Sequence, residues 1–196
     1  EILSPDAPID AFAGLDGIIL SGGPSSVYAE DRPPFNRAIL DSGLPMLGLC
    51  YGHQLICHEL GGRVKPGQTM EFGAAQLQVG VAEEILAGLG PRERIWMSHC
   101  DTVEEIPEGF EVLGTTEDCP IAAMAHRQKR IYGLQFHPEV THTEHGMQVL
   151  ENFVSLCGSA RDWTMENFIG ESVDALVRQA GDRNVFLLVS GGVDST

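Results

Sequence analysis

Short apolar runs alternate with segments of helical spacing in the first part of the chain. The runs GIIL (17–20) and PMLGL (45–49) have the length of strands, and the first runs directly into a glycine-containing turn. Between them, FNRAILDSG (35–43) has apolar residues at helical spacing and closes on Gly43. Strand, helix and parallel strand in this order predict an α/β fold with a doubly wound, mostly parallel sheet of the flavodoxin-like kind.

The middle of the chain, roughly 64–136, has a different pattern. One segment alternates apolar and polar residues, and several short apolar runs are separated by proline, glycine and charged turns. This pattern favours mixed or antiparallel strands. The predicted strands are AAQLQVGV (74–81), RIWM (94–97), FEVLGTT (110–116), IAAMAH (121–126) and RIYGLQF (130–136).

Two helices follow, separated by a short polar segment. The first is expected from Thr143 to about Gly158 on apolar residues near a 3.6 period, namely Met147, Leu150, Phe153, Val154 and Cys157. The second is expected from Thr164, as N-cap, to Gly181, with Phe168, Ile169, Leu176 and Val177 on its apolar face. NVFLLV (184–189) then reads as a buried strand that leads into SGGVDST (190–196).

These elements predict one domain over 1–157, a linker over 158–163 and the start of a second α/β domain over 164–196. No strand–helix unit precedes GIIL, and the second domain contains one helix, one strand and a loop. We therefore expect the chain to be a fragment whose first domain lacks its N-terminal strand.

Charge and composition exclude several classes of protein. A formal net charge of −16 with only 12 Lys and Arg argues against nucleic acid as a partner. No apolar stretch approaches the ~18 residues of a membrane helix, and EILSPDAPID carries no signal pattern. We expect a cytoplasmic protein with no membrane partner. Five cysteines without a C-x-x-C pair suit neither a disulfide framework nor a zinc site, which leaves room for one reactive thiol.

The motif GLCYG (48–52) predicts a nucleophile at Cys50. Flanking glycines are needed on a tight turn between a strand and a helix, because a Cβ there would clash with the backbone. Such a turn exposes the thiol at the sheet edge and points the N-terminus of a helix at it, which should lower its pKa and offer N–H groups to an oxyanion. An inert core cysteine is the alternative interpretation.

A base for this thiol is expected on another element, and FHPE (136–139) supplies one. Pro138 delays any helix, so His137 and Glu139 should lie on the loop after the strand RIYGLQF, where Glu139 could orient His137. His53 is the weaker candidate, expected at the surface or supporting the site. A metal cluster of His137, Glu139, His142 and His145 is a further alternative, disfavoured because Pro138 spoils the ligand spacing.

Two Ser-Gly-Gly turns follow predicted strands. In SGGP (21–24), Gly22 and Gly23 permit positive φ and close backbone approach, so their N–H groups could complete an oxyanion hole. In SGGVDST, small residues after an apolar strand suit a phosphate or pyrophosphate, although the lysine of a Walker A loop is absent.

Together these motifs resemble a known family. GLCYGHQ, SGGP, WMSHCD and QFHPEVTHT resemble the class I (triad) glutamine amidotransferases, and SGGVDST resembles the pyrophosphatase loop of adenylating synthetases with an adenine nucleotide alpha hydrolase-like fold. An amidotransferase domain followed by SGGVDST is the order found in the GMP synthetase family. The resemblance covers essentially the whole chain.

The resemblance implies a role for each motif residue in the first domain. Cys50 would attack the glutamine side-chain amide, His137 would protonate the departing ammonia and activate water, and Glu139 would orient His137. The oxyanion would be held by the backbone N–H groups of Tyr51, Gly22 and Gly23. Glutamine itself would be bound by Gln54 and by the backbone of Ser98 and His99.

For the second domain the resemblance implies that ATP adenylates XMP and that ammonia then displaces AMP to give GMP. ATP and Mg²⁺ would be co-substrate and ion, with no prosthetic group, and the complete enzyme would dimerise through a C-terminal domain absent here. Asp194 is the candidate Mg²⁺ ligand. The residues implied in pyrophosphate binding are Ser190, Gly191, Gly192, Val193, Asp194, Ser195 and Thr196.

The chain departs from the family pattern at two positions. Cys100 stands where a glycine is usual, in a turn expected beside the glutamine pocket, and Met70 stands where a basic residue is usual. Two alternatives stay open: another triad amidotransferase, serving CTP, anthranilate or carbamoyl phosphate synthesis, and a glutamine-binding module without activity.

Overall fold

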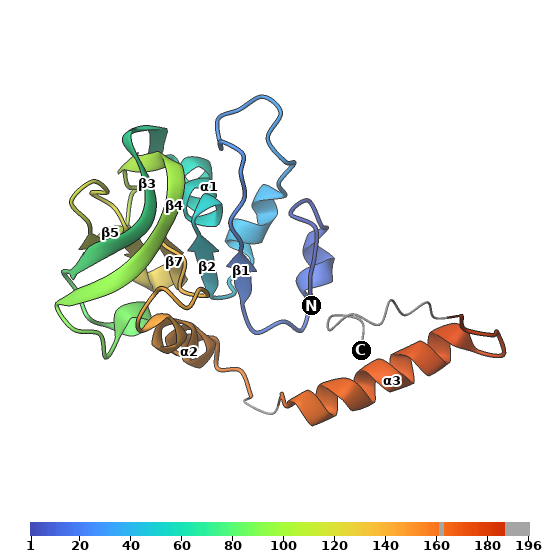
Figure 1. Ribbon diagram of the computed structural model, residues 1–196. Coiled ribbons are helices and arrows are strands. Elements are labelled where there is room, and N and C mark those ends of the chain that lie inside the picture. Colours follow the sequence, from blue (N-terminus) through green and yellow to red (C-terminus); the bar gives the residue numbers. More distant parts are fainter. Residues whose placement is uncertain (161–162, 187–196) are drawn as a thin grey trace. The chain divides into compact units, whose positions relative to one another are not determined.

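The computed structural model describes residues 1–160 and 163–186, which divide between two compact units, Glu1–Ser159 and Ala160–Thr196. The described part of the first unit contains one seven-stranded sheet with the order β1-β2-β7-β6-β5-β3-β4 (Figure 1). The strands are β1 Ile18–Leu20, β2 Met46–Leu49, β3 Arg63–Val79, β4 Arg92–Glu105, β5 Glu111–Thr115, β6 Ala123–His126 and β7 Ile131–Leu134.

The sheet is parallel at one end and antiparallel at the other. β2 pairs in parallel with both β1 and β7, while β6, β5, β3 and β4 continue the sheet in antiparallel pairings. The α/β class and the mixed character predicted for the middle section are thereby confirmed. In Figure 1 the long strands β3 and β4 curve together away from the parallel end.

Two α-helices cover opposite faces of the parallel strands. Side chains alternate across β2 and β7, so Leu47 joins one core with Phe153 of α2 (Gly146–Cys157). Met46 joins the other core with Ile56 of α1 (Tyr51–Glu59). Burial of both faces explains why the parallel strands read as continuous apolar runs. The short 3₁₀ helices are η1 Ile9–Phe12, η2 Arg37–Asp41, η3 Glu84–Leu86 and η4 Arg127–Lys129.

The helix predicted over 35–43 forms only the five-residue 3₁₀ turn η2. Its start is fixed by Asn36, whose side chain accepts a hydrogen bond from the Ala38 N–H, and the chain turns away at Gly43 with φ of 76°. Fewer than two α-helical turns fit between these two points, and a segment that short cannot offset the cost of α-helix nucleation.

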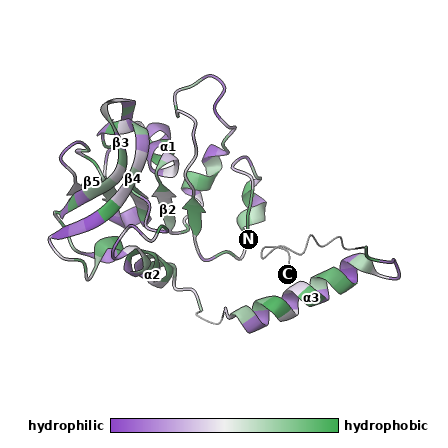
Figure 2. Cartoon of the chain, viewed as in Figure 1, coloured by the Kyte–Doolittle hydropathy of each residue, from purple (hydrophilic) through white to green (hydrophobic). Residues whose placement is uncertain are grey.

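The second unit contains α3 (Met165–Ala180) with the predicted ends. The Thr164 hydroxyl accepts a hydrogen bond from the Asn167 N–H, and Gly181 ends the helix with φ of 55°. Apolar and polar residues alternate along α3 in Figure 2. The apolar side chains expected on one face are all exposed within the described residues: Phe168, Ile169, Leu176 and Val177.

The strand predicted over 184–189 is not present in its described part. Residues 184–186 are irregular, and Val185 and Phe186 are exposed. A strand needs a neighbour for its backbone hydrogen bonds, and within the described ranges no strand pairs with this segment. The rest of the prediction, including SGGVDST, lies outside the described residues.

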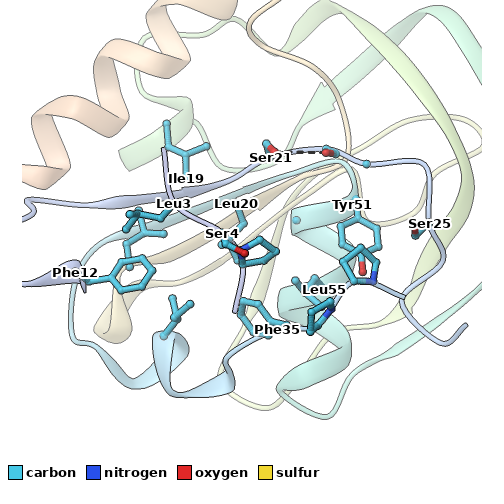
Figure 3. Close-up of a pocket in the computed structure, with 18 of the residues that line it drawn as sticks. Leu3, Ser4, Phe12, Ile19, Leu20, Ser21, Ser25, Phe35, Tyr51 and Leu55 are labelled. Atoms are coloured by element: carbon cyan, nitrogen blue, oxygen red, sulfur yellow. Dashed lines mark hydrogen bonds between the residues drawn. The ribbon is translucent and has the colours of Figure 1, made fainter. Parts of the chain in front are cut away.

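β1 forms an edge of the described sheet. It pairs with β2 on one side, and beside it lies a hollow of about 270 Å³ with an apolar lining (Figure 3). Leu3, Phe12, Phe35, Tyr51 and Leu55 contribute to this lining. Among the helices described, none is both long and apolar enough to cross a membrane.

Candidate active site

Cys50 lies on a strained turn between β2 and α1. Its φ of 51° and ψ of −103° are unusual for a residue with a side chain. A Cβ on Gly48 would lie 2.5 Å from the Gly52 carbonyl oxygen, and a Cβ on Gly52 would lie 2.1 Å from the Leu20 carbonyl oxygen. The flanking glycines are therefore required by steric contact, as the motif predicted, while the positive φ falls on the cysteine itself.

The Cys50 thiol is buried and held by polar neighbours. It donates a hydrogen bond to the Ser98 carbonyl oxygen (3.4 Å) and accepts one from the Gln135 side-chain amide (3.7 Å). Burial raises the pKa of the Cys50 thiol, and hydrogen bonding from the Tyr51 N–H and the charge of Glu139 act in opposite directions on it. This corrects the expectation that the helix N-terminus lowers the pKa, because desolvation outweighs the helix. To react as a nucleophile, a thiol in this setting would need a base.

His137 and Glu139 form a hydrogen-bonded pair on the loop after β7. His137 Nδ1 lies 2.6 Å from Glu139 Oε1, and the imidazole is only 18% exposed. A Cβ built on Gly22 would lie 3.6 Å from Cys50 Cβ and 3.5 Å from His137 Cε1. The turn after β1 therefore lies against both the cysteine and the histidine, so three loops at the carboxyl ends of parallel strands converge.

A pocket of about 450 Å³ opens beside Cys50. Seven of the predicted site residues line it: Gly22, Gly23, Cys50, Gln54, Ser98, His99 and His137. Tyr51 lines the hollow beside β1 instead, and Glu139, which is hydrogen bonded to His137, is not among the residues that line the pocket. Neither Gly22 nor Gly23 uses the positive φ that a glycine permits. They allow close approach without left-handed backbone.

Two predicted glutamine ligands have side chains engaged in the pocket wall. The Gln54 amide nitrogen donates to the Asp101 carbonyl oxygen (2.8 Å) and to Gln135 Oε1 (3.1 Å). The His99 imidazole bridges the Asp101 carbonyl oxygen and Glu71 Oε2, each at 2.9 Å. These bonds fix the wall of the pocket.

Sequence reasoning missed the carboxylate of Asp101, which also lines the pocket. It accepts hydrogen bonds from the Ser26 hydroxyl (2.5 Å) and the Tyr28 hydroxyl (2.8 Å). These bonds tie the loop after β1 to β4 across more than 70 residues of sequence. The only sequence signal was the closing Asp of WMSHCD, whose partners no local pattern could identify.

The departures from the family pattern can now be placed. Cys100 lies within β4, opposite an irregularity in β3, and lines the same pocket as Cys50. The turn expected at this position is therefore a strand. Met70 is 67% exposed on β3.

The four residues of the metal alternative are not brought together in the described part of the chain. His142 packs against the Trp96 ring at 4.4 Å between centroids, and His145 Nδ1 lies 2.6 Å from Glu93 Oε2. Glu71, His99 and Cys119 do form a compact group. The imidazole and carboxylate of that group already hydrogen bond to each other, with Thr116 and Asp101 as further partners. Asp194 and the rest of 190–196 lie outside the described residues.

His53 is fully buried, which excludes the surface position, the first of the two alternatives predicted for it. It lies in the first turn of α1, and a Cβ on Gly133 would come within 2.4 Å of its Nδ1. Both ring nitrogens are buried without a hydrogen-bond partner, although Ile121 and Gly133 offer backbone groups nearby. Burial lowers the pKa of His53 from 6.5 to about 3.

We expect His53→Met to stabilise the chain and to flatten its pH dependence. Because the folded pKa is depressed, the unfolded state alone binds a proton as the pH falls from 6.5 toward 3. The wild type should lose up to about 1.4 kcal/mol of unfolding free energy per pH unit through this group. At neutral pH the variant should gain about 1–3 kcal/mol, since it buries no unpaired polar group.

Urea unfolding of both proteins between pH 4.5 and 7.5 measures this effect. The difference in stability between variant and wild type should widen as the pH falls. Parallel pH profiles would show that His53 takes up its proton in the folded state, contrary to its buried position.

Comparison with known proteins places this geometry in a family. A family model described as glutamine amidotransferase class-I matches residues 1–157. A GMP synthase (glutamine-hydrolyzing) from Aquifex aeolicus is 45% identical over 199 residues, which cover 100% of this chain and 39% of that protein. The corresponding Vibrio vulnificus protein is 50% identical over 182 residues, 92% of this chain and 35% of that protein. The chain thus spans well under half the length of these relatives.

Solved structures agree. A Thermoplasma acidophilum protein provisionally assigned as a GMP synthase subunit superimposes with a TM-score of 0.72 at 31% identity, covering 83% of this chain and 82% of that one. A glutamine amidotransferase from Thermotoga maritima shares the fold at 20% identity, with a TM-score of 0.57 and coverage of 83% and 70%. With a family model matched over residues 1–157 and the strained turn at Cys50 where the motif predicted it, the chain belongs to the class-I glutamine amidotransferase family.

Proposed function

We propose that this chain hydrolyses glutamine to glutamate and ammonia with Cys50, His137 and Glu139, as the glutaminase part of a GMP synthase. The observation that carries the proposal is the convergence at Gly22. A cysteine on a strained elbow and a histidine paired with a carboxylate both approach this glycine, each from a different element. The arrangement has the parts of an activated nucleophile: thiol, base and orienting group.

The raised pKa of the Cys50 thiol gives each residue a distinct task. Glu139 accepts a hydrogen bond from the Nδ1–H of His137, which leaves Nε2 unprotonated and able to take the thiol proton as Sγ attacks the side-chain amide carbon of glutamine. The oxyanion is held by the N–H of Tyr51 and those of the Gly22–Gly23 turn. His137 then protonates the departing ammonia, and the γ-glutamyl thioester is hydrolysed by a water molecule that His137 deprotonates.

The chemistry of the pocket suits a free amino acid. The pocket wall includes the Asp101 carboxylate, which complements the α-ammonium group of glutamine. Gln54 and the backbone of Ser98 and His99 line the same pocket.

For the complete protein we propose that the ammonia serves GMP formation. ATP adenylates the C2 oxygen of XMP, and ammonia displaces AMP, so that glutamate, AMP, pyrophosphate and GMP are the products. The names of the relatives support this assignment, as does SGGVDST with its hydroxyl and N–H donors for pyrophosphate. The same proposal includes ATP as co-substrate with Mg²⁺ bound through Asp194. It also includes a homodimer and a cytoplasmic location.

We also propose the division into a domain over 1–157, a linker over 158–163 and a second domain from 164.

We further propose that a strand outside this chain pairs with β1. The unpaired edge and the adjacent apolar hollow support such a strand (Figure 3). Ile18 donates its N–H to Pro45, so Ile19 presents its N–H to the open edge. A chain extended at its N-terminus should slow amide exchange at Ile19 markedly. An unchanged rate of amide exchange at Ile19 would contradict the proposal that another strand pairs with β1.

Glutamine turnover by the purified chain tests the proposed function. We expect release of glutamate and ammonia in equal amounts, and an acid-quenched reaction should contain a γ-glutamyl adduct on the peptide that carries Cys50. Glutamine binding without adduct or turnover would instead identify an inactive binding module. In the full-length protein, acceleration by ATP with XMP would exclude the other triad amidotransferases.

A further inference from the structure

The Thr143 hydroxyl lies between β4 and the loop that carries His137. It donates a hydrogen bond to the His137 carbonyl oxygen (2.6 Å) and accepts one from the Trp96 N–H (3.1 Å). The His137 N–H donates to the Trp96 carbonyl oxygen (3.0 Å). The His137 N–H thus bonds directly to Trp96, while the His137 carbonyl oxygen is linked to the Trp96 N–H through the Thr143 hydroxyl. The three hydrogen bonds form a closed ring.

This ring fixes the position of the backbone from which the side chain of His137, the proposed base, extends. The loop after β7 leaves the sheet at Leu134 and contains Pro138, which donates no backbone hydrogen bond. Thr143 is buried, and its N–H is bonded to Val140, so its hydroxyl is held in place by the same turn. Glu144 adds one more bond to β4, from its N–H to the Arg94 carbonyl oxygen (3.0 Å).

The same strand also holds the nucleophile. Two residues beyond Trp96, the Ser98 carbonyl oxygen accepts the hydrogen bond from Cys50 Sγ. Two positions of β4, Trp96 and Ser98, thus contact the histidine loop and the thiol respectively. Because a strand is stiff over two residues, the spacing between base and nucleophile is fixed through β4 as long as the Thr143 hydroxyl keeps the loop attached.

We propose that Thr143 is a positioning residue for the glutaminase reaction, holding His137 at the distance from Cys50 at which it can take the thiol proton. The inference rests on the proposed function for its consequence in catalysis, and on the hydrogen-bond ring for the placement of His137. Loss of the hydroxyl removes two of the ring's three bonds and lets the loop shift. A displacement of about 1 Å at a reacting group can cost about 100-fold in rate.

Thr143→Val is the informative variant, because it removes the hydroxyl and keeps the shape. We expect kcat for glutamine hydrolysis to fall about 10- to 100-fold with KM changed less than about threefold, since the pocket wall is untouched. Thr143→Ser retains a hydroxyl and should restore kcat to within about threefold of the wild type. Thr141→Val, which changes an exposed threonine of the same loop, is the matched control and should behave as the wild type.

A second readout does not depend on turnover. The rate of Cys50 alkylation by iodoacetamide, measured against pH by mass spectrometry of the modified peptide, reports how readily the thiol loses its proton to His137. In Thr143→Val the alkylation rate at neutral pH should fall and its pH midpoint rise, while Thr143→Ser follows the wild type. Circular dichroism establishes that each variant is folded, and Thr143→Ala replaces Thr143→Val if the valine variant does not fold.

The outcomes separate the two proposals. A wild type that does not hydrolyse glutamine, but whose Cys50 alkylation responds to Thr143→Val as described, would contradict the proposed function and support the positioning role. Wild-type kcat and alkylation in a folded Thr143→Val or Thr143→Ala variant would overturn the positioning role. So would equal losses in the valine and serine variants, because the hydroxyl would then be irrelevant.

Discussion

Cys50→Ala is expected to lower glutamine hydrolysis by more than about a thousandfold and to abolish the covalent adduct. The thiol is the nucleophile of the proposed reaction, and removing a nucleophile leaves only the modest acceleration from the oxyanion donors and substrate binding. Alanine retains the Cβ on the elbow, so the backbone strain at φ of 51° is unchanged and the fold should persist. Glutamate release and circular dichroism on the same preparation measure both effects.

The chain offers a matched control in Cys100. This second thiol lines the same pocket but is exposed and lies within β4, not on the turn that begins α1. Cys100→Ala should keep activity within a few-fold of the wild type. If activity survived in Cys50→Ala and disappeared in Cys100→Ala, the nucleophile would have been assigned to the wrong cysteine.

Gly52→Ala is expected to destabilise the first unit by about 3 kcal/mol or more. The new Cβ would lie 2.1 Å from the Leu20 carbonyl oxygen, 2.8 Å from its carbonyl carbon and 2.9 Å from its Cβ. Two of these atoms are backbone, so no side-chain rotation relieves the contact, and α1 has to move away from β1. That movement also distorts the elbow at Cys50, so glutamine turnover should fall in the remaining folded protein. The urea midpoint at pH 7 measures the loss.

Gly170→Ala provides the comparison, because among the described residues no atom beyond the adjacent backbone of α3 itself lies within 4 Å of a Cβ at that position. It should leave the unfolding midpoint of the first unit unchanged. It should also raise the helix content slightly, because alanine is more favourable than glycine in a helix by roughly 1 kcal/mol. Equal midpoints for Gly52→Ala and the wild type would mean that β1 and α1 separate at little cost, and that the glycine is not required there.

The local chemistry of the site could be predicted because its causes are local. A cysteine between Gly48 and Gly52 at a strand end indicates an elbow, since the steric clash that excludes a Cβ arises within a few residues. Likewise, Pro138 keeps His137 and Glu139 together on a loop, and Thr164 and Gly181 mark the ends of α3. In each case the deciding contact or backbone constraint is short in sequence.

The errors at other positions share one origin: a local sequence pattern does not show how the rest of the chain surrounds a residue. Helical spacing over 35–43 gave no measure of the length available between Asn36 and Gly43, and the result is a 3₁₀ turn. The expected fall in the pKa of Cys50 considered the helix and not the desolvation that reverses it. A surface position was one of the two predicted for His53, because a single polar residue in a helix does not indicate which helix face packs against the sheet. The residue is fully buried.

The sequence alone determined the class of fold, the mixed character of the middle section, the elbow at Cys50 and the His137–Glu139 pair, because these depend on side-chain periodicity and on sterics between near neighbours. Only the tertiary structure decided that Asp101 meets Ser26 and Tyr28, that His53 is buried without partners, and that Thr143 ties His137 to the strand holding Cys50. Such features depend on which distant segments pack together and on how much water packing excludes, and neither is encoded in any short stretch of the chain.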